Sequence, residues 1–119
     1  MGSHNELGVQ GEQLAENHLK MAGYTVLCRN YRYLKAEIDI IALKGEVLTI
    51  VEVKTRSSDH IKPIAEAVDT KKIKLLALAA DNYVLESEWD GEVRFDIITV
   101  LRSQDKFAVN HIENAFFPF

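Results

Sequence analysis

The sequence has few of the features that mark secreted or membrane proteins. It contains a single cysteine, Cys28, so no disulfide can form within the chain. Cys28 lies beside Val26 and Leu27 in an apolar, strand-like segment, which favours a buried, inert thiol over a nucleophile. The mainly apolar stretches at 47–53 and 75–80 are far shorter than the roughly 20 residues that cross a bilayer, and no segment resembles a secretory signal. We therefore expect a cytoplasmic protein with no membrane partner.

Positive charge is also scarce. The chain has 14 Lys and Arg against 18 Asp and Glu, a net charge of −4, which argues against a uniformly basic surface. The acidity is uneven, because residues 1–80 hold 11 basic and 10 acidic residues while residues 81–119 hold 3 and 8. A solvated surface is at least as good an interpretation as binding for the lysines of 71–74. We predict a local phosphate-binding patch formed by Arg29, Arg32, Lys35 and Arg56.

The hydrophobic pattern begins with a helix at 5–22. Asn5 is its expected N-cap, and Gly23 marks its C-terminal end. Gly8 and Gly11 lower the helix propensity of this segment, so they predict that its first turns pack closely on another element.

Five strands and a second helix follow. The strands are expected at 24–29, 35–43, 47–55, 93–101 and 107–112, with turns at 30–34 and 44–46. The first three form an antiparallel meander. A polar loop at 56–63 leads to the second helix, which begins at Ile64, or after a break at Thr70, and ends near Leu85; this crossover allows the third and fourth strands to lie parallel. The order αβββαββ predicts one α/β domain, 1–119, with a central mixed sheet of about five strands flanked by helices.

Two acidic residues interrupt the apolar pattern of the second strand. Side chains alternate across a strand, so Glu37 and Asp39 are expected on one face, while Ile38 and Ile40 are expected on the other. An unpaired charge is too costly to bury. These acids must therefore pair with neighbouring charged groups or bind a metal ion.

The third strand carries a matching pair of charges at its end. Glu52 and Lys54 share one face of that strand by the same alternation. Counting outward from the turn at 44–46 places Asp39 near Glu52 and Glu37 near Lys54. The sequence therefore predicts a cluster of three acids and one lysine at adjacent strand ends.

This cluster has the composition of a metal-dependent phosphodiesterase site. Two carboxylates in a partly buried pocket repel each other, and one takes up a proton unless a cation lies between them. Mg²⁺ and Mn²⁺ prefer oxygen ligands, which Asp39, Glu52 and the Val53 carbonyl supply in this prediction. Lys54 would orient the attacking water and stabilise negative charge, and Glu12 adds a carboxylate from the first helix. The alternative is a set of cross-strand salt bridges with neither metal nor catalysis.

These residues also carry a resemblance. Asp39, followed after twelve residues by Glu52-Val53-Lys54, resembles the motif of the PD-(D/E)XK nuclease superfamily. One departure is Ile38, which stands where a proline often precedes the first aspartate. The wider pattern is similar to the YraN-like family of uncharacterised bacterial proteins, which is grouped by fold with archaeal Holliday-junction resolvases. That pattern comprises Gly11-Glu12, Ala15, Leu19, Gly23-Tyr24, Arg29-Asn30, EIDIIA at 37–42, VEVKTR at 51–56, Ala67-Val68 and RFDIITV at 94–100.

The resemblance implies a restriction-endonuclease-like three-layer fold and metal-dependent catalysis. It assigns Asp39, Glu52 and Lys54 to the catalytic core. Glu12 matches the helix-borne acid of the resolvases, and Glu37 has a supporting role near the site. Because resolvases act on two strands and are usually dimers, the resemblance also implies a homodimer and a branched DNA substrate.

We therefore expect a Mg²⁺- or Mn²⁺-dependent endonuclease that acts on DNA. One alternative is a nucleic-acid-binding module that has this fold but no efficient catalysis. Another is a protein-interaction domain, for which the apolar tail 115–119 is the only indication. The phenylalanines of that tail are otherwise expected to close the core. Asp96 is expected to be structural and to pair with Arg94 or with a helix end.

Overall fold

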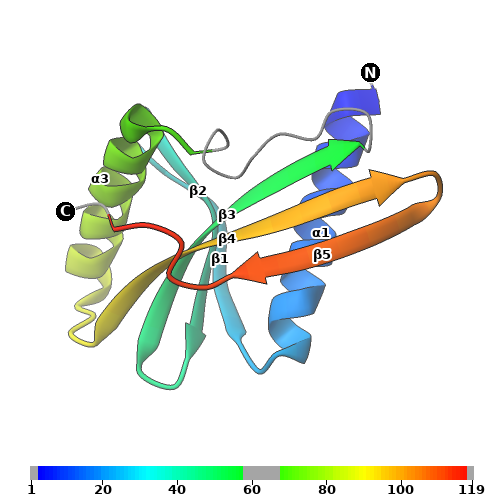
Figure 1. The fold of residues 1–119 in the computed structure, drawn as a ribbon. Helices are drawn as coiled ribbons and strands as arrows, with labels where there is room; N and C mark the ends of the chain where they lie inside the picture. Colours follow the sequence, from blue (N-terminus) through cyan, green and yellow to red (C-terminus); the bar gives the residue numbers. More distant parts are fainter. Residues whose placement is uncertain (1–2, 58–67, 118–119) are drawn as a thin grey trace.

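The computed structural model describes residues 3–57 and 68–117, which form two helices and five strands (Figure 1). In chain order these elements are α1 (Ser3–Met21), β1 (Thr25–Tyr33), β2 (Ala36–Lys44), β3 (Val47–Ser57), α3 (Thr70–Ser87), β4 (Glu92–Ser103) and β5 (Lys106–Ile112). The predicted order αβββαββ is confirmed. Neither of these helices is long and apolar enough to span a membrane.

The five strands form one mixed sheet in the order β1-β2-β3-β4-β5. β3 and β4 run parallel from the pair Val47 and Glu92 to the pair Ser57 and Arg102, and the other neighbours are antiparallel. The predicted meander and the predicted parallel pair are both confirmed. Helix α1 lies on one face of the sheet and α3 on the other, giving three layers (Figure 1).

Each face of the sheet has its own apolar core. The core under α3 joins Leu76, Ala79 and Ala80 of the helix to buried strand residues, namely Ala36, Ile38, Ile41, Leu48, Ile50, Phe95 and Ile97. The core under α1 joins Ala15 and Leu19 of that helix to Tyr24, Ile40, Ala42, Val51, Ile98 and Val100. Burial on both faces explains why the central strands are almost continuously apolar.

The predicted turn at 30–34 is wrong, because β1 continues to Tyr33. Tyr31 and Tyr33 pack against the core under α3, which keeps this segment extended. Asn30, which favours turns, is instead a single residue with a φ of 54° inside the strand. The actual turn lies at Leu34 and Lys35.

The alternation of side chains along β2 is interrupted at Asp39. Ile38 packs in the core under α3 together with Ile41, whereas Ile40 packs in the core under α1. The expectation that Ile38 and Ile40 share a face is therefore wrong. The pairs flanking Asn30 place this left-handed residue opposite Asp39, so the irregular positions of the two strands coincide.

The ends of the helices also differ from the predicted bounds. Helix α1 begins at Ser3, so Asn5 lies inside the helix and is not its N-cap. The C-terminal end at Gly23 is confirmed, because this glycine has a φ of 94°. Helix α3 begins at Thr70 and Asp69 is its N-cap; the alternative start at Ile64, like residues 58–63 of the predicted loop, lies outside the described residues.

Gly11 is the point of closest approach between α1 and the sheet. A Cβ atom at this position would overlap the side chain of Thr55 in β3. The prediction of close packing is confirmed for Gly11, but Gly8 has nothing within 4 Å of such an atom. Gly11 therefore sets the height of α1, and of its neighbour Glu12, above the sheet.

We expect Gly11→Ala to lower the free energy of unfolding by about 1–3 kcal/mol, because the added methyl group must displace Thr55 or the helix. Gly8→Ala is the matched control, and it should raise stability by up to about 1 kcal/mol through helix propensity alone. Urea denaturation of both variants measures the difference. Equal stability of the two would contradict close packing at Gly11.

Candidate functional site

The candidate site lies where β2 separates from β3. The ladder between these strands ends at the pair Ile40 and Val51. One residue further, the Asp39 Oδ2 atom accepts a hydrogen bond from the Val53 backbone N–H at 2.8 Å. A side-chain carboxylate thus replaces a backbone acceptor at the point of separation. This places Asp39 beside both Glu52 and the main chain of Val53, as the register predicted.

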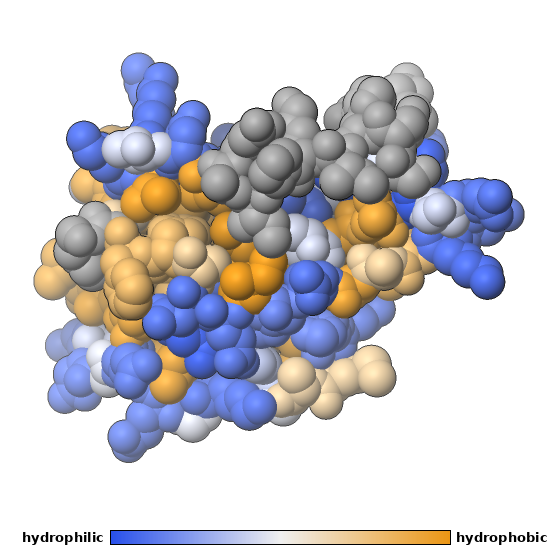
Figure 2. All heavy atoms as spheres, viewed as in Figure 1, coloured by the Kyte–Doolittle hydropathy of each residue, from blue (hydrophilic) through white to orange (hydrophobic). Residues whose placement is uncertain are grey.

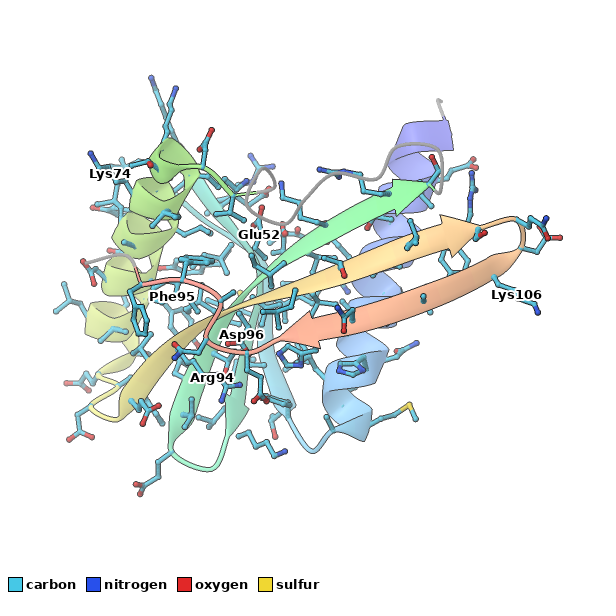
Figure 3. The ribbon with its side chains drawn as sticks, viewed as in Figure 1. Glu52, Lys74, Arg94, Phe95, Asp96 and Lys106 are labelled. Carbon is cyan, nitrogen blue, oxygen red and sulfur yellow. The ribbon has the colours of Figure 1, made fainter. Side chains whose placement is uncertain are left out.

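Glu52 is the buried centre of this arrangement. Its side chain is only 2% exposed, and it projects between β3 and α3 (Figure 3). The Oε2 atom lies 3.3 Å from Lys54 Nζ and 3.2 Å from Lys72 Nζ. The Oε1 atom is buried and has no hydrogen-bond partner among the described residues. A buried carboxylate oxygen without a donor is costly and marks a place for a proton or a cation.

Asp39 responds electrostatically to this neighbour. Burial, followed by repulsion from the Glu52 carboxylate, raises the pKa of Asp39 to about 7. The hydrogen bond from Val53 opposes this rise, and the charge of Glu12 adds to it. Two adjacent carboxylates in a partly desolvated site cannot both ionise without a compensating cation. Both lysines contact Glu52, so Asp39 itself has no ion-pair partner among the described residues.

The donor set fits a hard divalent cation. No group of three or more His, Cys, Asp or Glu side chains within 3–57 and 68–117 has metal-binding geometry. A closed zinc-type site is thus not formed by these residues. Mg²⁺ differs, because it commonly binds through one or two carboxylates and completes its shell with water and substrate oxygens. Asp39, Glu52 and the Val53 main chain match that requirement.

Glu12 reaches towards the site from α1 but already has a partner. Its Oε1 atom lies 3.2 Å from the Arg29 guanidinium, which also contacts Glu16 at 2.6 Å. Glu16 in turn pairs with Lys20 at 2.7 Å. Glu16 is therefore largely covered, with a side chain that is only 15% exposed. Arg29, predicted to contact phosphate, is neutralised by two acids.

The other predicted residues lie around the rim. Glu37 pairs with Arg32 across β1 and β2 at 2.9 Å rather than with Lys54. Lys35 is exposed in the turn between those strands. Arg56 lies two residues beyond Lys54 on β3 and donates to the Thr55 carbonyl at 2.9 Å.

Lys72 is the residue that sequence reasoning missed. The sequence leaves the lysines of 71–74 open between solvated surface and binding, and of these lysines only Lys72 contacts Glu52. The sequence did contain an indication of this contact. Lys72 precedes Leu76 and Ala79 at helical spacing, and these two residues form the buried face of α3. Lys71 and Lys74 lie off that stripe and are exposed, and Lys74 points away from the sheet (Figure 3).

A second buried acid, Asp96, lies on the α1 face of β4. Its carboxylate accepts hydrogen bonds from Arg94 at 2.8 and 2.9 Å and from the Asn114 N–H at 2.9 Å. His111 Nε2 lies 2.7 Å away. The predicted pairing with Arg94 is confirmed. Every one of these partners belongs to the C-terminal half, so Asp96 is a structural centre distinct from the Glu52 site.

Comparison with known proteins gives a consistent match. The model of a family described as "Uncharacterised protein family UPF0102" matches residues 11–100. A UPF0102 protein of Christiangramia forsetii is 46% identical over 119 residues, covering 100% of both chains. Similar proteins from Bacteroides thetaiotaomicron and Parabacteroides distasonis are 47% and 44% identical, covering 99% and 98% of this chain and 98% and 97% of their own.

Proposed function

The chain belongs to the UPF0102 family, and we propose that it is a metal-dependent endonuclease that hydrolyses DNA phosphodiester bonds. One observation supports this proposal above the others: the buried Glu52 Oε1 atom has no donor among the described residues, and the neighbouring carboxylate of Asp39 has a raised pKa. A salt-bridge cluster built only for stability would supply a donor there. A site that binds a cation leaves the oxygen free.

The residues around this oxygen have separate tasks in the proposed reaction. Asp39, Glu52 and the Val53 carbonyl would hold Mg²⁺ or Mn²⁺, which supplies a bound water of lowered pKa and neutralises charge on the scissile phosphate. Lys54 lies on the same strand face as Glu52 and contacts it at 3.3 Å. Its ammonium group orients the attacking water and stabilises the negative charge that develops on the phosphate. Glu12 would add a further metal-binding carboxylate from α1 by exchanging its ion pair with Arg29, and Glu37, paired with Arg32, would support the site.

The proposed DNA contacts are not equivalent. Within the described residues, Arg29 and Arg32 are ion-paired to acids, whereas Lys35 and Arg56 have no acidic partner. Phosphate contacts supply most non-specific affinity for DNA. Lys35 and Arg56 should therefore contribute more of that affinity than the two paired arginines.

The assembly and setting of the protein are part of the same proposal. Branched DNA as the substrate, a homodimer and a cytoplasmic location follow from the resemblance to resolvases and from the lone cysteine. Apolar residues gather on the side where α3 and the C-terminal tail lie (Figure 2). Leu85 and Phe117 are 75% and 72% exposed there. This side is the proposed contact between two copies.

The proposal is tested by cleavage of duplex, single-stranded, flap and four-way-junction DNA, with an RNA duplex beside them, in Mg²⁺, Mn²⁺ or chelator. We expect cutting of DNA with metal and none with chelator. Lys54→Ala should slow cleavage by about 100-fold or more, because it removes charge stabilisation at the phosphate. Lys106→Ala is the control, since this exposed lysine lies at the far end of the β4–β5 hairpin (Figure 3).

Two outcomes would contradict the proposal. Cleavage of no substrate under any metal condition would remove the nuclease assignment. Equal cleavage by wild type and Lys54→Ala would remove the catalytic role of the lysine. Gel-shift binding of DNA without cleavage would instead favour a nucleic-acid-binding module, for which the existing ion pairs of Lys54 and Lys72 with Glu52 are the supporting observation.

A further inference from the structure

The Glu52 carboxylate has two lysines on one oxygen atom. Lys54 Nζ and Lys72 Nζ lie 3.3 Å and 3.2 Å from Oε2, and neither is close enough to Oε1 to satisfy it. Lys54 comes from the same strand, two residues away. Lys72 comes from α3. A second ammonium group on a single oxygen is more than a simple ion pair needs, and it divides the carboxylate into an occupied and a free oxygen.

Lys72 is delivered by a well-anchored helix. Its backbone N–H donates to the Asp69 Oδ1 atom at 2.8 Å, which is the N-cap bond of α3. Leu76 and Ala79, one and two turns later on the same stripe, are buried in the core under α3. The position of the Lys72 Cα atom is therefore fixed by capping and packing. The long side chain, 39% exposed, then extends its ammonium group to Glu52.

This arrangement limits how many metal ions the site can hold. Sites with two divalent ions place them about 3.5–4 Å apart and clamp them with shared oxygen ligands. Here Asp39 Oδ2 accepts from Val53 and Glu52 Oε2 is covered by two ammonium groups. Of the other nearby acids among the described residues, Glu12 pairs with Arg29 and Glu37 pairs with Arg32. Within the part of the chain that the structure describes, the unpartnered Glu52 Oε1 atom can serve one ion.

We infer that Lys72 is a resident counter-cation of Glu52, which occupies the position of a second metal ion and makes this a one-metal site. The inference rests on the proposed function, because it concerns the same metal-binding carboxylates. Lys72 acts through Glu52 and is a positioning residue. Since its positive charge repels the incoming ion, removing that charge should tighten metal binding, whereas loss of a merely structural contact would weaken it or leave it unchanged.

The test measures Mn²⁺ binding by calorimetry and by electron paramagnetic resonance, without any nucleic acid. We expect one ion per wild-type chain. Lys72→Met keeps the apolar stem and removes the charge, and it should raise Mn²⁺ affinity about tenfold. Lys72→Gln serves as a second neutral variant if Lys72→Met does not fold. Lys74→Met, an exposed lysine on the same helix, should bind as the wild type does.

The outcomes separate this inference from the proposed function. Two ions on the wild-type chain, or unchanged or weaker affinity in the neutral Lys72 variants, would overturn the role of Lys72 and leave the metal-dependent nuclease standing. Absence of Mn²⁺ binding in the wild type and in both neutral variants would overturn both. Tighter binding in the Lys72 variants alone supports the inference, whatever substrate the protein cuts.

Discussion

Asp39→Asn should abolish divalent-ion binding and, at the same time, stabilise the metal-free protein. The amide is a poor ligand for Mg²⁺, so affinity should fall by more than about 100-fold, beyond what changes outside the ligand shell cost. The amide oxygen can still accept the Val53 N–H, and the new N–H group can donate to the unpartnered Glu52 Oε1 atom. One unfavourable pair of buried carboxylates is thereby replaced by a hydrogen bond.

The size of this stabilisation should depend on pH. The folded protein holds the Asp39 proton up to about pH 7, whereas the unfolded chain releases it near its ordinary pKa of 3.8. The cost of ionised Asp39 is therefore absent at low pH, grows as the pH rises and is complete above about pH 7. Asparagine does not ionise, so the advantage of the variant should be largest above neutrality, smaller near about pH 5 and lost below about pH 4.

Urea unfolding in chelator at about pH 5 and about pH 8, combined with Mn²⁺ calorimetry, measures both effects. We expect a gain of roughly 1–2 kcal/mol at the higher pH. Asp105→Asn, in the exposed turn between β4 and β5, is the matched control and should change neither property. Wild-type metal affinity in Asp39→Asn would remove this residue from the metal site, and a loss of stability at the higher pH would contradict the electrostatic account.

Asp96→Ala should have the largest effect on stability. Asp96 is fully buried and joins three partners: Arg94, His111 and the Asn114 main chain. Removing one member of a buried ion pair leaves the other charge uncompensated, which costs about 3–5 kcal/mol. The bonds to His111 and Asn114 also fix the end of β5 and the start of the tail. Thermal and urea denaturation should therefore show a strongly destabilised chain.

The same carboxylate should make the wild type sensitive to acid. Burial by itself raises the pKa of Asp96, but the hydrogen bonds from His111, Arg94 and Asn114 outweigh it, and the net pKa is lowered. A carboxyl group with a lowered pKa stabilises the fold above its unfolded pKa, and that contribution is lost as the pH falls through the folded value. The stability difference between wild type and Asp96→Ala should thus be large at neutral pH and shrink below about pH 4.

A difference that stays constant down to the acid range would contradict this account, because it would show that the Asp96 charge is not what stabilises the fold. Asp105→Asn is again a suitable control, since it removes an exposed acid near the same pair of strands. Its unfolding curve should follow that of the wild type within about 0.5 kcal/mol.

The central part of the site follows from sequence rules. The tight turn before Val47 fixes the register of β2 and β3, and counting from it brings Asp39 to Glu52. The parity of β3 correctly groups Glu52 with Lys54. These predictions succeed because a short hairpin determines its own pairing, independently of the rest of the fold.

The parts that sequence rules missed depend on tertiary contacts. Ile38 changes face where the left-handed Asn30 of the neighbouring strand lies opposite Asp39, and no period-two rule contains that information. Arg29 was predicted to be free for DNA, but the docking of α1 brings Glu12 and Glu16 to it. Lys72 joins the site only when α3 packs on the sheet. The helical spacing of Lys72 is visible in the sequence, but its contact with Glu52 is not.

The expectation for the C-terminal tail is also met only in part. Phe116 packs on Phe95 with ring centroids 5.4 Å apart, so the expectation that the phenylalanines close the core is met there. Phe117 is 72% exposed, and Phe119 lies outside the described residues. The sequence does not distinguish these phenylalanines from one another. The hydrogen bond from the Ala115 N–H to the Phe95 carbonyl comes just before Phe116, and it is visible only in the structure.

The parallel pairing of β3 with β4 affects how late in folding the candidate site is completed. Val47 can pair with Glu92 only after α3 has crossed the sheet, so this ladder closes a long loop. Pairings of this kind form slowly compared with hairpins. The β2–β3 hairpin can form early, while Glu52 is still solvated and Lys72 is still distant. A nascent or truncated chain that ends before β4 would therefore have Asp39 and Glu52 side by side in water, without the buried environment that raises the pKa of Asp39.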